Sequence, residues 1–199
     1  MARPPALAAL PDPLPIEPVR GPLDADVRVP GSKSVTNRAL VCAALAEGTS
    51  TLTGALFADD TEAMLGVLAA VGLGVDTDPE AARIIVVGGG GALPRPDAEV
   101  DVRQSGTTAR FVVPMLAAAG GRHRVTAHPQ MQARPMDATF AALRALGAGV
   151  EDQGRAGHLP VTVAGGLRSG VVRVPGDASS QFLSGLLLIG PCLPDGLVV

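Results

Sequence analysis

Apolar residues recur every three to four positions in five stretches of the chain, and short runs of β-branched residues lie between them. A spacing of three to four residues is typical of helices that bury one face, and runs of β-branched residues are typical of strands. We therefore expect a mixed α/β (α+β) protein. The expected helices cover residues 34–46, 60–71, 107–119, 136–146 and 179–192, and the expected strands cover residues 49–54, 84–87, 123–127, 161–163 and 196–199, with short strands near Val75 and Val150.

The order of these elements repeats, which indicates an internal duplication. Residues 47–75 align with residues 120–150, so that Gly48, for example, falls on Gly121, 73 positions later. Each copy reads as a βαβα pattern followed by strands. A third copy starts near residue 179 and reaches its first helix and one strand before Val199, so we expect an incomplete third repeat with uncovered apolar surface.

Three helices are expected to begin at equivalent points of the repeats, at Ser34, Thr107 and Ser180, again 73 residues apart. Free N–H groups at a helix N-terminus attract anions. If the copies share one core around an approximate three-fold axis, the three ends lie together and favour a multiply anionic ligand. The alternative is three ordinary capped helices. Four cations occur in or near the same segments, namely Lys33, Arg38, Arg110 and Arg134.

The segment from Pro30 to Ala39 is the most informative candidate for a ligand-binding site in the chain. A strand-like run ends at a turn at Gly31, and a helix follows that carries Lys33 and Arg38 as well as hydroxyl groups. Full positive charges beside a helix N-terminus are suited to phosphate or carboxylate. An ordinary turn with a serine N-cap is the alternative. The order of residues does not match the phosphate-binding loop of nucleotide hydrolases.

Composition narrows the class of protein. The chain has 199 residues, of which 47% are hydrophobic, and a formal net charge of −3. We expect a globular, cytoplasmic protein without a nucleic-acid surface. No apolar run approaches the roughly 18 residues of a membrane span. Residues 1–18 are rich in Pro and Ala and are expected to be a mobile extension before a domain at 19–199.

The remaining candidate chemistry is weak. Cys42 and Cys192 lie in apolar helical runs and are expected to be buried, reduced thiols. The three histidines have no ligand spacing and are expected on the surface or in loops, and no metal or cofactor is expected. The acidic run 59–62 is interpreted as the N-cap and first turn of a helix, and the glycines at 88–91 as a turn.

Four motifs, in order and at matching spacing, strongly resemble the 5-enolpyruvylshikimate-3-phosphate synthase family. The resemblance covers residues 19–199. Members have two similar domains, each built from three βαβαββ units, with the active site between the domains, so the chain resembles most of the first domain. The motifs are Pro30-Gly31-Ser32-Lys33-Ser34 with Asn37-Arg38-Ala39, Ser105-Gly106-Thr107 with Arg110, Arg134-Pro135, and Ser179-Ser180-Gln181-Phe182.

The resemblance implies a role for each matching residue. Lys33 would contact phosphoenolpyruvate close to the reacting hydroxyl and would be the catalytic residue of this half. Gly106 and Arg134 would bind the phosphoenolpyruvate phosphate, and a side chain at position 106 should obstruct that approach. The residues implied for shikimate 3-phosphate are Ser34, Arg38, Ser179 and Ser180, and Gln181 would lie between the two ligands.

The implied reaction transfers the enolpyruvyl group of phosphoenolpyruvate to the 5-hydroxyl of shikimate 3-phosphate, a step toward chorismate and aromatic amino acids. No cofactor is implied. The acid and base groups of the family come largely from the second domain, so we expect the 199-residue chain alone to show no steady turnover. Gln104 stands where many members carry Asn, and Phe111 where some carry Pro, which leaves glyphosate sensitivity open.

Two alternatives remain at this point. The UDP-N-acetylglucosamine enolpyruvyl transferases share the fold, but their typical Gly-Ala-Lys-Asn motif and loop cysteine are absent here. The second alternative is a catalytically inactive fragment, or one half of a split protein that needs a second-domain polypeptide as its partner.

Overall fold

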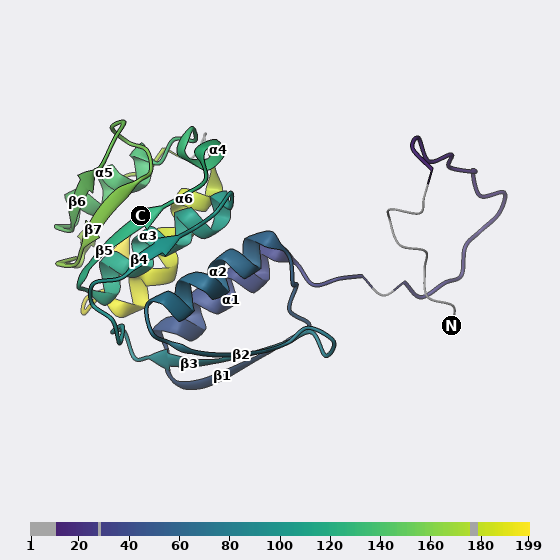
Figure 1. The fold of residues 1–199 in the computed structure, drawn as a ribbon, viewed down its shortest axis with the longest axis horizontal. Helices are drawn as coiled ribbons and strands as arrows, with labels where there is room; N and C mark the ends of the chain where they lie inside the picture. Colours follow the sequence, from purple (N-terminus) through teal and green to yellow (C-terminus); the bar gives the residue numbers. More distant parts are fainter. Residues whose placement is uncertain (1–10, 28, 176–178) are drawn as a thin grey trace.

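Helices and strands alternate along the chain in the computed structural model, which describes residues 11–27, 29–175 and 179–199 (Figure 1). The helices are α1 (Lys33–Leu45), α2 (Asp59–Ala70), α3 (Gly106–Ala119), α4 (Pro129–Gln132), α5 (Asp137–Ala145) and α6 (Ser180–Ile189), with a 3-10 turn η2 (Gly190–Cys192). The strands are β1 (Glu47–Thr53), β2 (Gly74–Asp78), β3 (Arg83–Gly89), β4 (Glu99–Asp101), β5 (Arg122–Thr126), β6 (Gly149–Asp152), β7 (Val161–Ala164), β8 (Gly170–Val171) and β9 (Leu197–Val198). The expected α/β class is confirmed.

The first unit is a small antiparallel sheet with two helices on one face. Its strands lie in the order β1-β3-β2, and α1 and α2 pack beside one another above them (Figure 1). Ile84 and Val86 alternate along β3 and are fully buried, because every second side chain of a strand points to the covered face. Met64 and Leu68, one helical turn apart on α2, are fully buried as well.

The second unit repeats this arrangement with one more strand. Its sheet has the order β4-β5-β7-β6, in which β4 pairs with β5 in parallel and the other pairs are antiparallel. The unit therefore shows the full βαβαββ order, with the short helix α4 added between β5 and α5. Two elements of this unit were not expected from the sequence, namely β4 and α4, which have only three and four residues.

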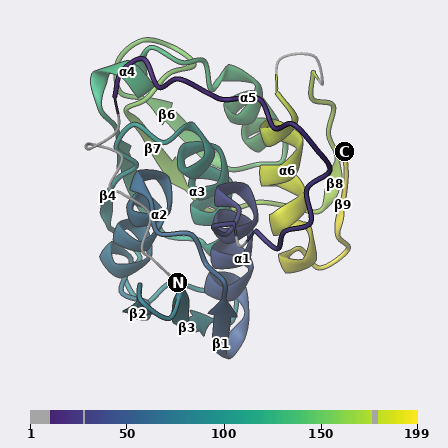
Figure 2. The same ribbon diagram turned by 90° about the vertical axis from the view of Figure 1, so that its right-hand side faces the viewer.

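The third unit contributes α6 and a two-stranded parallel sheet of β8 and β9. The first helices of the three units pack against one another, with α3 in contact with both α1 and α6 (Figure 2). Phe111 and Met115 of α3 are fully buried at this centre. Val171 and Val198, in contrast, are 75% and 62% exposed, as expected for a repeat that covers little of its own apolar surface.

The segment before α1 does not form the expected strand. Val27 and Val29 are exposed, belong to no strand, and lie in a stretch that runs away from the helices and sheets (Figure 1). A short run of β-branched residues needs a paired edge to become a strand. Residues 11–18 of the expected extension are exposed and form no helix or strand, and its residues 1–10 lie outside the described part.

Several burial predictions are wrong. Cys42 and Cys192 are both exposed, because each lies on the outward side of its helical segment. His123 is fully buried in β5, where its ring nitrogens pair with the Ala98 N–H and the Gly120 carbonyl oxygen. His158 is buried too, but it lies in a loop, which is one of the two expected settings. His128 is exposed, as expected, and caps α4. Of the glycines at 88–91, the first two belong to β3 and only the later two form a turn.

Among the described residues, no helix combines the length and the apolar character that a membrane span requires.

Candidate functional site

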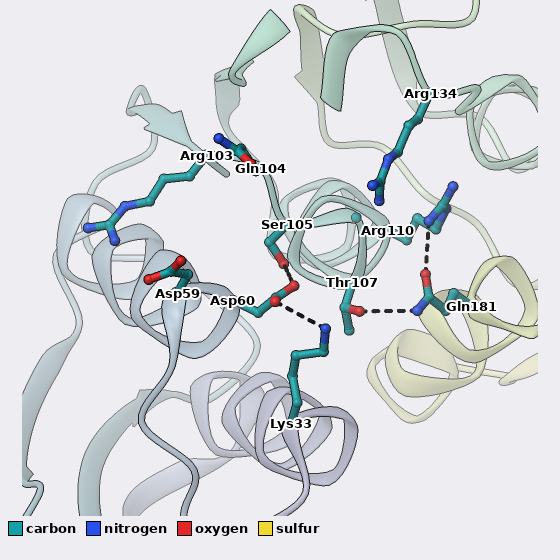
Figure 3. Close-up of a pocket in the computed structure, with 11 residues that line it drawn as sticks. Lys33, Asp59, Asp60, Arg103, Gln104, Ser105, Thr107, Arg110, Arg134 and Gln181 are labelled. Atoms are coloured by element: carbon teal, nitrogen blue, oxygen red, sulfur yellow. Dashed lines mark hydrogen bonds and ion pairs between the residues drawn. The ribbon is translucent and has the colours of Figure 1, made fainter. Parts of the chain in front are cut away.

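The N-terminal turns of α1, α3 and α6 line one open pocket of about 490 Å³, so the expected convergence of three helix starts is confirmed (Figure 3). Because the helices run from the pocket into the core, their free N–H groups and positive dipole ends face it. The lining residues are Lys33, Asp59, Asp60, Arg103, Gln104, Ser105, Gly106, Thr107, Arg110, Arg134 and Gln181.

Lys33 is the first residue of α1 and the only lysine in the sequence. The hydroxyl of Ser32 caps the helix by accepting a hydrogen bond from the N–H of Val35. The Lys33 ammonium lies 3.1 Å from Asp60 Oδ2, and the Lys33 side chain is 45% exposed. The cap therefore places the Lys33 ammonium at the edge of the pocket, where Asp60 of α2 binds it.

The approach to α3 is a tight turn with a left-handed residue. Arg103 has φ of 50°, a region in which side chains other than glycine are strained. Its N–H donates to Asp101 Oδ1, and its carbonyl accepts from the N–H of His128, which stabilises the conformation. Ser105 then caps α3 by accepting from the N–H of Thr108. The turn brings Gly106 to the wall of the pocket.

Two arginines converge over Gly106. A Cβ atom at this glycine would lie 2.9 Å from Arg110 Nη1 and 3.0 Å from Arg134 Nη1, so both guanidinium groups lie close above the backbone (Figure 3). Burial and, to a smaller extent, the charge of Arg134 lower the pKa of Arg110. Arg110 Nε is buried without a hydrogen-bond partner among the described residues. Two like charges with an unused donor are typical of an anion site.

Gln181 connects α6 to this cluster. Its amide nitrogen donates to Thr107 Oγ1 at 3.1 Å, and its amide oxygen accepts from Arg110 Nη1 at 2.9 Å. The Arg110 guanidinium also lies over the ring of Phe182, 4.9 Å from its centre. These contacts fix the position of Arg110 relative to the helix starts. Gln181 is therefore a link between two units as well as part of the pocket wall.

The remaining expected site residues lie beside the pocket lining, on the α1–α6 side. Arg38 donates to the Ser34 carbonyl oxygen at 3.0 Å and to Ser184 Oγ at 3.1 Å. Ser179 caps α6 through the N–H of Gln181, and Ser180 is exposed. The chain thus has two adjacent polar groups, one around Lys33, Gly106, Arg134 and Gln181 and the other around Ser34, Arg38, Ser179 and Ser180.

Asp60 was interpreted from the sequence only as a residue of a helix first turn. It does lie in the first turn of α2, although the expected N-cap in the acidic run is wrong, because the N-cap is Ala58. The Asp60 carboxylate also bonds Lys33 and Ser105 inside the pocket. No sequence pattern could show this link, because the partners are 27 and 45 residues away. Within residues 11–27, 29–175 and 179–199, no cluster of three or more His, Cys, Asp or Glu side chains is suited to a metal ion.

Comparison with known proteins identifies the family of this chain. The family model described as EPSP synthase (3-phosphoshikimate 1-carboxyvinyltransferase) matches residues 19–199. A 3-phosphoshikimate 1-carboxyvinyltransferase of Opitutus terrae is 45% identical over 186 residues, which are 92% of this chain and 43% of that protein. One of Nostoc punctiforme is 40% identical over 181 residues, which are 90% of this chain and 42% of that protein.

The solved structures include an EPSP synthase from Acinetobacter baumannii that is 32% identical to the chain. It superimposes with a TM-score of 0.76 over 84% of this chain and 38% of that one. The chain therefore spans less than half the length of the relatives it matches. Because the family model matches the whole sequence after residue 18, the chain belongs to the EPSP synthase (3-phosphoshikimate 1-carboxyvinyltransferase) family.

Proposed function

We propose that this chain forms one half of a site for enolpyruvyl transfer from phosphoenolpyruvate to the 5-hydroxyl of shikimate 3-phosphate. The observation that carries the proposal is the pair of guanidinium groups of Arg110 and Arg134 above the backbone of Gly106, at the N-terminus of α3. Guanidinium groups and free N–H donors at one point are suited to a phosphate dianion. The names of the matched relatives support the same reaction.

In this proposal the phosphate of phosphoenolpyruvate lies between Arg110 and Arg134, with Gly106 leaving room for it. Lys33 is the catalytic residue of this half, because its ammonium at the pocket edge can reach both the phosphoenolpyruvate and the attacking hydroxyl. Gln181 lies between the two ligands. The group formed by Ser34, Arg38, Ser179 and Ser180 holds shikimate 3-phosphate, since it supplies hydroxyl donors and one cation next to the same pocket.

The chemistry requires two anions to be held side by side. The 5-hydroxyl oxygen loses its proton and adds to C2 of the enol phosphate while C3 gains a proton. The resulting tetrahedral intermediate then loses phosphate from C2 and a proton from C3, which restores the double bond. Clustered cations offset the repulsion between the two ligands and orient them. Repulsion and misorientation account for a large part of the activation barrier of such a reaction. The acid and base for the two proton transfers are proposed to come from a second-domain polypeptide, as the resemblance implies.

Ligand titration tests this function on the chain itself. The sequence has no Trp or Tyr, so amide chemical shifts of the ¹⁵N-labelled protein are a better signal than fluorescence. Phosphoenolpyruvate should shift Gly106 and Gln181, and shikimate 3-phosphate should shift Ser34 and Ser180. Glycerol 2-phosphate at equal ionic strength is the control for nonspecific phosphate binding.

Two results would decide between the alternatives. Saturable shifts at these residues without turnover by the chain alone, together with turnover once a second-domain polypeptide is added, would support a split or partial enzyme. Shifts that are absent, or identical for glycerol 2-phosphate, would contradict the proposed function. Binding without turnover in the presence of the added polypeptide would support the inactive-fragment alternative.

A further inference from the structure

Asp60 joins three helices at the wall of the pocket. One carboxylate oxygen lies 3.1 Å from the Lys33 ammonium on α1, and the other accepts a hydrogen bond from Ser105 Oγ, the cap of α3, at 2.5 Å. Its own backbone carbonyl accepts from Thr108 Oγ1 at 2.8 Å. Both side-chain oxygens of Asp60 are therefore bonded to residues outside α2, and its backbone carbonyl binds a further one.

An acid at a helix N-terminus does not explain these contacts. Asp59, Asp60 and Glu62 all lie in the first turn of α2, where a negative charge is favourable for any of them. Asp59 is exposed and forms no side-chain hydrogen bond with the described residues, and Glu62 pairs with Arg103 at 3.5 Å. Only Asp60 reaches the other two helices. Its side chain is 24% exposed, so the bond to Lys33 is partly shielded from water.

We propose that Asp60 is a positioning residue that holds the Lys33 ammonium against the start of α3, so that Lys33 faces the anion site at Gly106. This inference rests on the proposed function of the pocket. A free lysine side chain at a helix start has many rotamers, and holding it in one geometry removes that entropic cost from ligand binding. The hydrogen bond from Ser105 to Asp60 Oδ1 fixes the orientation of the carboxylate. It therefore also fixes the direction in which Asp60 Oδ2 faces Lys33.

Positioning and simple charge make opposite predictions for Asp60→Asn. Removal of a negative charge from a pocket that takes anions should tighten their binding if charge alone counts. Loss of the ammonium's partner should weaken binding if position counts. Asp59→Asn is a matched control, because it removes the same charge from the adjacent residue and the same pocket without breaking a bond to Lys33.

The first experiment titrates the two variants and the wild-type chain with phosphoenolpyruvate. We expect Asp60→Asn to bind about three- to tenfold more weakly, the range of a partly exposed ion pair with a charged hydrogen bond. Asp59→Asn should bind at least as tightly as the wild type. Equal tightening in both variants would overturn the proposal, and circular dichroism should first show that both melt as folded proteins.

A double-mutant cycle shows whether Asp60 acts through Lys33. In a Lys33→Gln background, the change Asp60→Asn should no longer weaken phosphoenolpyruvate binding, because the group that it positions is gone. A loss of the same size in both backgrounds would contradict a role through Lys33. It would indicate instead that Asp60 acts only on the capped start of α3.

A ligand-free measurement separates this inference from the proposed function. Because Lys33 is the only lysine, ¹⁵N-lysine labelling yields a single side-chain ammonium resonance. We expect this signal in the wild type and in Asp59→Asn, and its loss in Asp60→Asn, since an unpaired ammonium exchanges its protons with water faster. An unchanged signal in Asp60→Asn would contradict the inference that Asp60 holds the Lys33 ammonium. If the signal behaves as expected but the wild type binds no phosphoenolpyruvate, the proposed function fails, and the inferred role of Asp60 in ligand binding fails with it.

Discussion

Gly106 shows how much of the site depends on the absence of one side chain. It begins α3, and the space where a Cβ atom would lie is bordered by the ends of Arg110 and Arg134. The two guanidinium groups can come close to the backbone N–H groups only because nothing stands between them. The arrangement of the two arginines thus depends on the missing side chain at Gly106. The family resemblance suggests this role for the glycine, and the structure supplies the distances.

The substitution Gly106→Ala should weaken phosphoenolpyruvate binding about five- to tenfold while the fold stays intact. A methyl group at 2.9 and 3.0 Å from the two Nη1 atoms must push flexible side-chain ends aside, which costs little stability but displaces the phosphate donors. Amide-shift titration measures the affinity, and thermal unfolding measures stability.

The matched control for this substitution is Gly66→Ala in α2, where an added Cβ meets nothing within 4 Å. It should leave the affinity as it is and raise stability slightly, because alanine favours the helix. A Gly106→Ala chain that binds phosphoenolpyruvate as well as Gly66→Ala does would contradict the assignment of the phosphate to this point.

At the scale of single elements, the end of β6 is tied to its neighbours by one carboxylate. Asp152 Oδ1 accepts from the N–H of Gly157 at 2.9 Å, and Oδ2 pairs with Arg144 of α5. Burial by itself raises the pKa of Asp152, but the bonds from Gly157 and Arg144 outweigh it, so the pKa lies below its ordinary value. The ionised carboxylate therefore stabilises the folded state.

This shift makes stability depend on pH in a definite direction. Because the folded-state pKa is lowered, the contribution of Asp152 is present above the unfolded-state pKa of about 3.9 and is lost as pH falls through the folded value. Asp152→Asn should lower the free energy of unfolding by about 1 kcal/mol at pH 7, and the difference should vanish in strong acid. Denaturant unfolding at several pH values measures it.

Glu99→Gln provides the comparison for Asp152, since its ion pair with Arg124 is on the surface and its side chain is 61% exposed. That variant should change stability at pH 7 by less than about 0.5 kcal/mol. If the two variants lose the same free energy of unfolding, the bonds of Asp152 to Gly157 and Arg144 contribute no more to stability than an exposed ion pair does.

The elements themselves were largely predictable. Helices α1, α2 and α3 begin within one residue of the expected positions, because apolar periodicity, the capping serines of α1 and α3 and the acidic first turn of α2 are local signals. The strand expected before Pro30 was wrong, since a strand also needs an edge to pair with. The short strand β4 was missed for the related reason that three residues carry almost no pattern of their own, and it exists through its pairing with β5.

At the scale of the whole molecule, the close packing of α6 on α3 brings the third unit to the pocket. Gly185 is buried at this contact, where an added Cβ would clash with the backbone carbonyl oxygen of Arg110 and lie 3.2 Å from Pro114. The same contact places Gln181 against Thr107, one turn earlier on each helix. The pocket therefore depends on how tightly two units pack.

Gly185→Ala should destabilise the fold by about 1–3 kcal/mol, because the clash is with backbone that cannot rotate away. It should also weaken phosphoenolpyruvate binding, since α6 and Gln181 must move outward. Thermal unfolding followed by circular dichroism checks the first effect and amide-shift titration the second. Gly66→Ala is again the control, and a Gly185→Ala chain as stable as that control would contradict the packing.

The sequence alone determined the local features of this protein: which segments form the longer helices, where they begin, that the units repeat, and which family the motifs resemble. These follow from propensity, capping and periodicity, which act within a few residues. Burial of Cys42, Cys192 and His123 was predicted wrongly, because it depends on which face of an element meets another. Only the tertiary structure decided that Asp60 holds Lys33, that Arg110 and Arg134 face each other without an anionic partner among the described residues, and that three helix starts share one pocket. Those are contacts between residues far apart in sequence, and packing of the three units creates them.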